Sequence, residues 1–192
     1  MYLEWNFSDK QNLAKDTSGH GHDGVNHDVK SAVDNGVDVA KFFKAVNRHI
    51  YIETGKLDNF DKNNYTFSCW FKYDKYTRSA MGGRIFILGE LYFTICQPQY
   101  QILVLGKTPQ GKLTGVGPTG AILPPEVWHH LAISNDGKML RMYENGRERL
   151  KMGASRFAVP SADARIRIGG GPKHVWYTNL IGEMSQVRIY NK

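Results

Sequence analysis

The sequence predicts an all-β fold of the sandwich type, and three observations support that prediction. Residues 128–146 alternate apolar and polar side chains, and the dipeptides Asp136-Gly137 and Asn145-Gly146 interrupt the alternation where tight turns are expected. Short strand-like runs recur along the rest of the chain, separated by Gly, Pro, Asn and Asp. Helical periodicity is almost absent. Together these features are typical of a β-sandwich.

The length and composition suit a single domain over residues 1–192. The chain shows no linker, no repeat and no low-complexity segment, and 41% of its residues are hydrophobic, which is enough for a sizeable core. No apolar run approaches the ~18 residues of a membrane span, so we expect no membrane insertion. The first residues lack a basic region followed by an apolar stretch, and we therefore expect no signal peptide.

Alternation and apolar runs bounded by turn residues indicate the strands. Residues 128–150 are expected to form a three-stranded meander. The other expected strands are Leu3–Phe7, Val25–Val29, Val37–Phe43, Arg48–Glu53, Tyr65–Tyr73, Arg84–Leu88, Tyr92–Cys96, Gln101–Leu105, Lys112–Val116, Ala164–Ile168 and Met184–Tyr190. Between two of these strands, residues 55–61 are expected to form a helical turn in which Leu57 and Phe60 cover one end of the core.

The expected strand Tyr65–Tyr73 has two distinct faces. Phe67, Cys69 and Phe71 share the face that alternation assigns to the core. Cys69 is therefore expected to be buried as a small apolar residue, and a chain of this length can form its core without a disulfide. Trp70 lies on the opposite face, where it either lines a sugar-stacking surface or packs under a covering loop.

Several segments in chain order carry a family resemblance. They are Asp16 to Gly19 with Gly21 and Gly24, YTFSCWF at 65–71, WHHLAIS with LRMYENG within 128–146, IRIGG at 166–170 and IGEMSQVRIYN at 181–191. This series resembles the laminin G-like branch of the concanavalin A-like lectin/glucanase superfamily. The resemblance implies a jelly roll of two antiparallel sheets, with Leu3–Phe7 paired beside Val187–Tyr190. It also implies carbohydrate binding or adhesion as the commonest role.

The enzymatic members of that superfamily place two carboxylates on one strand in an E-x-D-x-x-E pattern, so that one acts as nucleophile and the other as acid. The present chain has no such spacing, since its glutamates at 90, 126, 144 and 148 stand apart. No hydrolase elbow, zinc-binding helix or phosphate loop appears either. The sequence therefore predicts no catalytic residues.

The loop at residues 16–28 is the expected metal site. Asp16 and Asp23 can supply the hard oxygen ligands that Ca²⁺ prefers, and the resemblance implies structural calcium because several relatives carry it in their loops. His20, His22 and His27 leave open a transition-metal site instead. Turn formation alone also explains Asp and Gly at these positions.

A second loop carries the expected ligand-binding residues. Lys173, His174, Trp176 and Tyr177 follow the glycine turn at 169–171, and Arg78 lies in another long loop. Aromatic rings beside hydrogen-bond donors are what sugar binding requires, because the apolar faces of sugars stack on rings. The alternative is that the 173–177 loop folds back and shields the core.

The net charge of +7 comes from Lys and Arg scattered through the chain. It indicates either a solvated surface or an anionic partner such as an acidic polysaccharide. Nucleic acid is not expected, because no recognised reading motif is present. Trp128 and His130 match the family's strand motif and are expected to be structural.

The sequence thus predicts a noncatalytic, lectin-like recognition or adhesion module whose partner is a glycan or a surface protein. The alternative is a structural or decoration module of a virus particle or another surface assembly, which would use the same fold for contacts with other structural proteins. The sequence predicts no particular cellular location.

Overall fold

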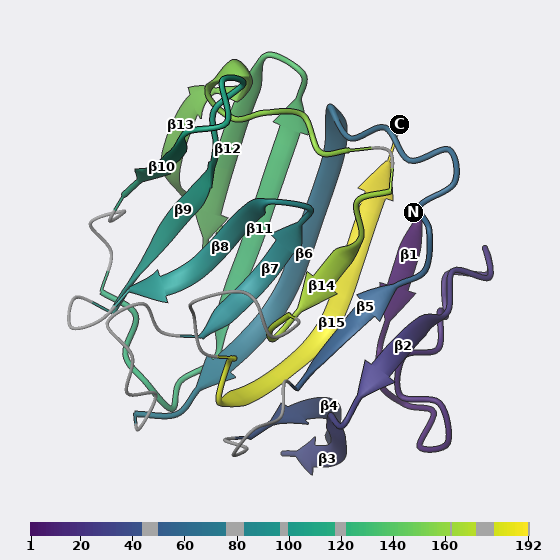
Figure 1. The fold of residues 1–192 in the computed structure, drawn as a ribbon. Coiled ribbons are helices and arrows are strands. Elements are labelled where there is room, and N and C mark those ends of the chain that lie inside the picture. Colours follow the sequence, from purple (N-terminus) through teal and green to yellow (C-terminus); the bar gives the residue numbers. More distant parts are fainter. Residues whose placement is uncertain are drawn as a thin grey trace.

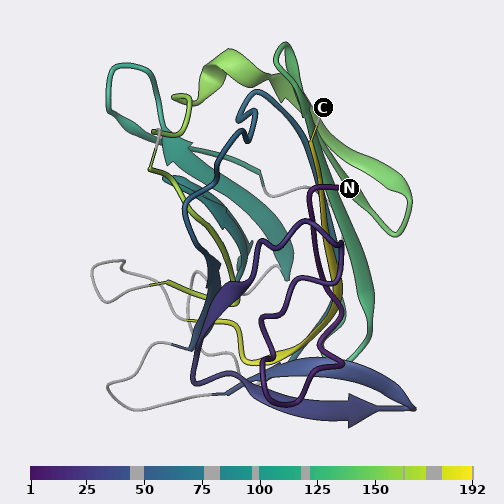
Figure 2. The same ribbon diagram turned by 90° about the vertical axis from the view of Figure 1, so that its right-hand side faces the viewer.

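The computed structural model describes residues 1–43, 50–75, 83–96, 100–117, 122–161, 163–171 and 179–191. Within these residues the chain forms two antiparallel β-sheets, which lie as separate layers in Figures 1 and 2. The all-β sandwich expected from the sequence is confirmed. No helix among the described residues is long and apolar enough to cross a membrane.

The larger sheet has eight strands in the order β13-β12-β11-β6-β15-β4-β3, with β1 also paired to β15. These strands are β1 (Leu3–Trp5), β3 (Lys30–Asp34), β4 (Val37–Phe42), β6 (Asn64–Tyr73), β11 (His129–Asp136), β12 (Met139–Glu144), β13 (Arg147–Gly153) and β15 (Gly182–Asn191).

The smaller sheet has seven strands in the order β10-β9-β8-β7-β14-β5-β2. Its strands are β2 (Gly24–His27), β5 (Tyr51–Thr54), β7 (Arg84–Leu88), β8 (Leu91–Cys96), β9 (Gln101–Lys107), β10 (Leu113–Val116) and β14 (Ile166–Ile168). A short 3₁₀ helix, η1 (Ala154–Arg156), follows β13.

The first and last strands pair, as the family resemblance implies. Leu3 lies opposite Ile189 and Trp5 opposite Val187, so the two ends of the chain meet at one side of the larger sheet (Figure 1). Trp5 is fully buried, which means that this pairing contributes directly to the core. The backbone of Phe7 has a φ of 62°, which is not an extended conformation, and the strand therefore ends earlier than expected.

The meander of β11, β12 and β13 forms where the turn dipeptides predict it. The Asp136 carboxylate accepts hydrogen bonds from the backbone N–H groups of Lys138 and Met139, at 2.9 and 2.7 Å. Asn145 and Gly146 both have positive φ, at 48° and 77°, as a two-residue hairpin turn requires. Local turn chemistry therefore sets the register of β11 with β12 and the start of the β12–β13 pairing, which shifts at a bulge between Met142 and Tyr143.

The core lies between the two sheets, and β6 contributes one of its largest faces. Phe67, Cys69, Phe71 and Tyr73 are all fully buried, and the Phe67 ring stacks on Phe86 of the opposite sheet with 4.0 Å between centroids. Burial also raises the pKa of the Cys69 thiol. The buried position predicted for Cys69 is confirmed.

The structure differs from the sequence prediction at two places. Lys30–Asp34 forms strand β3, where the sequence patterns predict no element. Asn35 and Gly36, with φ of 48° and 81°, turn it into β4. Residues 55–61 form turns rather than a helix, although Leu57 and Phe60 are buried as expected. The helical prediction was wrong because packing of these two side chains decides the conformation, and Asn59 at φ 57° interrupts any helix.

Gly169, just after β14, gives a test of the close packing around the buried ring of Phe42. Its φ is 76°, and a Cβ there would lie 2.0 Å from Cε1 of the buried Phe42 ring. We expect Gly169→Ala to cost roughly 1–2 kcal/mol for the left-handed backbone and about 1–3 kcal/mol more for the overpacked core. Gly146→Ala is the matched control, because Gly146 has φ 77° with no atom within 4 Å of a Cβ. Thermal melting of both variants should show the larger loss for Gly169→Ala, and equal losses would contradict the close packing.

Candidate functional site

The predicted ligand-binding residues Arg78, Lys173, His174, Trp176 and Tyr177 lie outside the described residues. The described residues that flank them do meet. Arg84, which follows segment 76–82, forms a parallel β-bridge with Asn179, which follows segment 172–178. A Cβ on Gly83 would lie 2.4 Å from the Cα of Leu180, so the two backbones are in direct contact.

A third segment ends at the same place. A Cβ on Gly170 would lie 2.2 Å from Oδ1 of Asn179 and 2.8 Å from the carbonyl oxygen of Ile50, the residue after segment 44–49. Segments 44–49, 76–82 and 172–178 therefore share closely packed attachment points. We call this region the loop end of the sandwich and define it by Ile50, Gly83, Arg84, Gly171 and Asn179.

Arg84 is a buried cation at the loop end. Only 1% of its surface is exposed, and its guanidinium carbon lies 4.8 Å from the ring centroid of Tyr92, where cation and ring attract each other. A Cβ on Gly171 would lie 3.5 Å from Nη1 of Arg84. The glycine run after β14 thus passes close beside this guanidinium.

Asp16 organises the N-terminal loop through hydrogen bonds to its carboxylate. Oδ1 accepts from the N–H groups of Glu4 and Ser18, and Oδ2 accepts from the N–H of His22 and the hydroxyl of Ser18, all at 2.9–3.0 Å. Burial alone would raise the pKa of Asp16, but these donors outweigh it and hold the pKa below its usual value. The carboxylate is therefore fully used in stabilising the loop.

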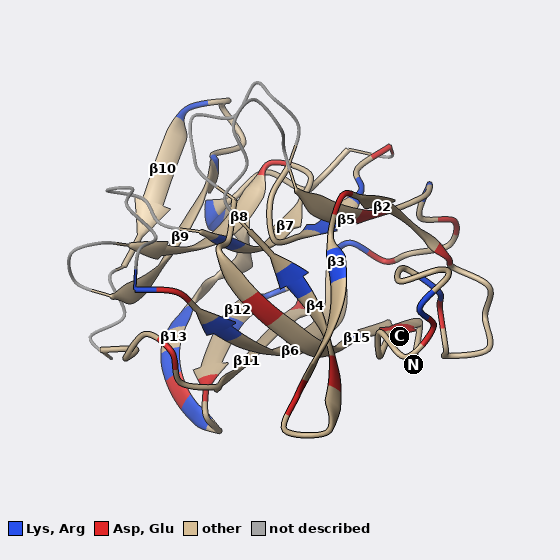
Figure 3. Cartoon of the chain, turned by 90° about the horizontal axis from the view of Figure 1, so that it is seen from below, with Lys and Arg blue, Asp and Glu red and all other residues tan. Residues whose placement is uncertain are grey.

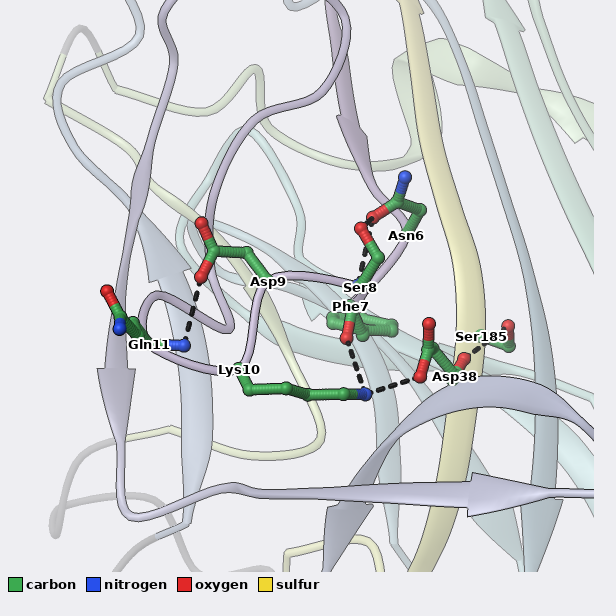
Figure 4. Close-up of polar contacts among 8 residues, drawn as sticks. All are labelled: Asn6, Phe7, Ser8, Asp9, Lys10, Gln11, Asp38 and Ser185. Carbon is green, nitrogen blue, oxygen red and sulfur yellow. Dashed lines mark hydrogen bonds and ion pairs between the residues drawn. The ribbon is translucent and has the colours of Figure 1, made fainter.

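The rest of this loop is held by the same kind of contact. Asp23 accepts a hydrogen bond from the N–H of Asp16 at 2.7 Å, and Asp9 accepts from the N–H of Gln11 at 2.9 Å. Figure 4 shows Lys10 extended between the Phe7 carbonyl and the Asp38 carboxylate, which ties the loop to β4. Side-chain oxygens thus take the place of a regular ladder along residues 6–23.

The three loop histidines do not converge on one point, although the rings of His20 and His22 lie side by side with 6.4 Å between centroids. His22 stacks on Tyr2 with 4.2 Å between centroids, whereas His27 stacks on Tyr51 at 4.1 Å and approaches Glu53. In the part of the chain that the structure describes, no group of three or more His, Cys, Asp or Glu is placed to hold a metal ion. The calcium site at Asp16 and Asp23 stays a prediction, and turn formation accounts for both side chains.

Trp128 has a structural environment. Its indole N–H donates to Oδ2 of Asp34 at 2.7 Å, and the Lys72 ammonium lies 5.1 Å from its ring centroid. Lys72 also pairs with Asp34 and Glu183, at 2.7 and 2.8 Å. This cluster fastens the β3–β4 turn to the outer face of the larger sheet. The sequence patterns do not predict this cluster, although the Asn35-Gly36 dipeptide signals the turn.

Trp70, in contrast, is not covered by the described residues. Its exposed fraction is 39%, and its ring lies 5.1 Å from the ring of His130 on the neighbouring strand. The sequence allows either an open surface or a covering loop over Trp70. Among the described residues, Trp70 faces solvent.

Comparison with known protein families matches residues 46–192 to the laminin G-type family described as the concanavalin A-like lectin/glucanases superfamily. The match covers more than half of the chain and agrees with the two-sheet architecture. The chain therefore belongs to the concanavalin A-like lectin/glucanase superfamily. A search of curated proteins finds no match.

Solved structures with the same fold include domain 4 of AbnA, an extracellular GH43 arabinanase from Geobacillus stearothermophilus, in complex with arabinotriose. It is 19% identical with a TM-score of 0.73, over 99% of this chain and 91% of that one. The ligand-binding domain of botulinum neurotoxin serotype D, in complex with N-acetylneuraminic acid, is 18% identical with a TM-score of 0.72, over 99% of this chain and 47% of that one.

The binding domain of Paraclostridial Mosquitocidal Protein 1 is 16% identical with a TM-score of 0.68, over 93% of this chain and 46% of that one. This chain thus spans about half the length of the two toxin domains. At these identities the likeness shows the shared fold.

Replacing Asp16 tests whether the loop depends on its carboxylate or on a metal. Asp16→Ala leaves three N–H groups without their acceptor, and we expect a loss of about 1–3 kcal/mol in the free energy of unfolding. Because the folded pKa is depressed, the stabilisation is present at neutral pH and is lost as pH falls through that pKa.

Thermal melting with and without millimolar CaCl₂ is the measurement, and Asp58→Ala is the control because the Asp58 side chain is 71% exposed. The predicted calcium site requires a rise in melting temperature that Asp16→Ala abolishes. A rise that survives in Asp16→Ala places calcium elsewhere. If the unaltered protein shows no rise, Asp16 and Asp23 serve only to form the turns of the loop.

Proposed function

We propose that this protein is a noncatalytic carbohydrate-binding module that recognises a glycan at the loop end of the sandwich. The observation that carries the proposal is the bridge between Arg84 and Asn179, because it brings together the attachment points of the two segments that hold Arg78 and residues 173–177. Lys173, His174, Trp176 and Tyr177 combine rings for stacking with donors for sugar hydroxyls.

The comparisons support the ligand class. Two proteins of the same fold were solved with sugars, arabinotriose in one and N-acetylneuraminic acid in the other. The family itself includes lectins. A positively charged chain with Arg78 and Lys173 in the segments proposed to bind suits glycans that carry acidic groups as well as neutral ones.

The environment of the buried acids supports a noncatalytic role. Glu53 is bound by Arg165 and Arg167, at 3.1 and 2.8 Å, and Glu144 is bound by Arg149 at 3.0 Å. Asp16 is held by the backbone N–H groups of its loop. A glycosidase needs two carboxyl groups about 5–10 Å apart, facing one substrate, and one of them must carry a proton. Carboxylates already paired with arginines or amides do not meet that need.

A glycan array followed by titration tests the proposal. If Trp176 stacks on a sugar, Trp176→Ala should lower affinity roughly 2- to 13-fold or more, which corresponds to about 0.5–1.5 kcal/mol beyond the area of the ring. Lys173→Ala should weaken acidic glycans most. Lys138→Ala is the matched control, since Lys138 is exposed in the β11–β12 turn. This turn lies beside the start of β6, whereas the segment that holds Arg78 follows the end of β6.

Melting curves of the same variants distinguish binding from core packing. If Trp176 shields the core, its removal should cost about 3–5 kcal/mol of stability with unchanged affinity, and the proposal fails. An array without any hit, together with a stable assembly in native mass spectrometry, would instead favour a structural module.

A further inference from the structure

Trp70 presents a large aromatic ring on the outer face of the eight-stranded sheet. The β6 residues on either side of it in sequence, Cys69 and Phe71, are fully buried, so Trp70 points away from the core. Its exposed fraction is 39%, which leaves part of the indole ring accessible to solvent. The ring packs beside His130, with centroids 5.1 Å apart and planes at 57°, which holds it in a defined position.

Short side chains surround Trp70 along β6 and β11. Ser68 lies opposite Ala132, and Thr66 lies opposite Ser134, all partly exposed on the same outer face. At about 3.4 Å per residue, the distance from Trp70 to Thr66 is roughly 14 Å. The region therefore combines one exposed ring with a floor of hydroxyl groups and small side chains. We call it the Trp70 face and define it by Thr66, Ser68, Trp70, His130, Ala132 and Ser134.

The neighbouring strands border this face with polar and aromatic groups. On β15, Arg188 lies opposite Ser68 and Tyr190 lies opposite Thr66. On β12, Tyr143 lies opposite Ala132 and Arg141 lies opposite Ser134. Donors, acceptors and phenol rings thus flank the floor on both sides.

The charges around the Trp70 face are compensated. Arg188 pairs with Glu4 and Arg141 with Asp136, each at 2.7 Å. Lys72, two residues beyond Trp70 on the same face of β6, pairs with Asp34 and Glu183. Burial and the nearby Arg188 charge lower the pKa of His130, which favours the neutral form of its ring. In a chain with a net charge of +7, this face offers no unpaired cation among its described groups to an anionic ligand.

This combination matches a neutral saccharide better than other ligands. The apolar face of a sugar ring stacks on indole, and its hydroxyls bond to serine hydroxyls and to paired Arg and Glu side chains. A nucleic acid needs unpaired cations. A stable protein interface needs a larger apolar centre than one exposed tryptophan among hydroxyl groups provides.

We propose that the Trp70 face is a second carbohydrate-binding site, specific for neutral oligosaccharides and separate from the loop end. The Trp70 face is built from strand residues on the outer surface of the larger sheet, whereas the loop end includes Gly83, Arg84 and Asn179, where the chain passes between the two sheets. The Trp70 face therefore does not depend on the site assigned above to residues 173–177.

Variants on this face separate the two sites. Trp70→Ala removes the ring, Trp70→Phe retains a smaller one, and Ala132→Arg places a long charged side chain on the floor without entering the core. Val33→Ala is the control, because Val33 is 62% exposed on the edge strand β3. Each variant is titrated with a panel of neutral oligosaccharides that includes arabinotriose, and with N-acetylneuraminic acid as an anionic probe, by calorimetry.

We expect Trp70→Ala and Ala132→Arg to lower the affinity for at least one neutral oligosaccharide by roughly 10-fold or more, because both the stacking and the buried area are lost. Trp70→Phe should retain part of the affinity, and Val33→Ala should leave it unchanged. Melting temperatures should change little, since Trp70 is partly exposed.

Three results would overturn the proposal. The first is binding of neutral sugars that Trp176→Ala abolishes and Trp70→Ala leaves intact, which would leave the loop end as the sugar site. The second is the absence of neutral-sugar binding in the unaltered protein, even where N-acetylneuraminic acid binds. The third is self-association that Trp70→Ala and Ala132→Arg abolish in light scattering, which would make this face a protein interface.

Discussion

The alternation of side chains along β6 is the constraint on which the rest of the structure depends. This strand pairs with β11 on one side and with β15 on the other, so its register sets the faces of all three. Phe67, Cys69 and Phe71 enter the core, and Ser68 and Trp70 consequently face outward. A shift of one residue would exchange these two sets and bury hydroxyl and indole groups in place of phenyl rings. The core and the Trp70 face are therefore two consequences of one register.

Ion pairs distribute the charge of this basic chain over its surface. In Figure 3, basic and acidic positions are interspersed on β12, β13 and the β3–β4 hairpin rather than gathered on one side. Several of these pairs join distant parts of the chain, such as Arg188 with Glu4 and Arg167 with Glu53. They connect strands that the backbone ladder already aligns, and the more exposed ones, such as Arg188 with Glu4, contribute modestly to stability. Their main consequence is that the sheet face around Trp70 carries little net charge.

The loop end and the Trp70 face use the fold in different ways. At the loop end, close contacts between Gly83 and Leu180 and between Gly170 and Asn179 hold the starting points of separate segments together. On the Trp70 face, the side chains proposed to contact a sugar lie on the strands themselves and are positioned by the sheet. A site on strands is held more rigidly than one on loops, whereas loops tolerate more sequence change. One domain can thus combine a variable contact with a fixed one.

The sequence by itself determined the strand-rich fold, the β11–β13 meander and the inward position of Cys69, because turn dipeptides and alternation act over a few residues. It also placed Trp70 on an outer face. Only the tertiary structure decided that Trp70 is exposed while Trp128 is packed against Asp34 and Lys72. Alternation tells which side of a strand a residue occupies, but what covers that side depends on segments far away in the sequence, and here Asp34 lies 94 residues from Trp128.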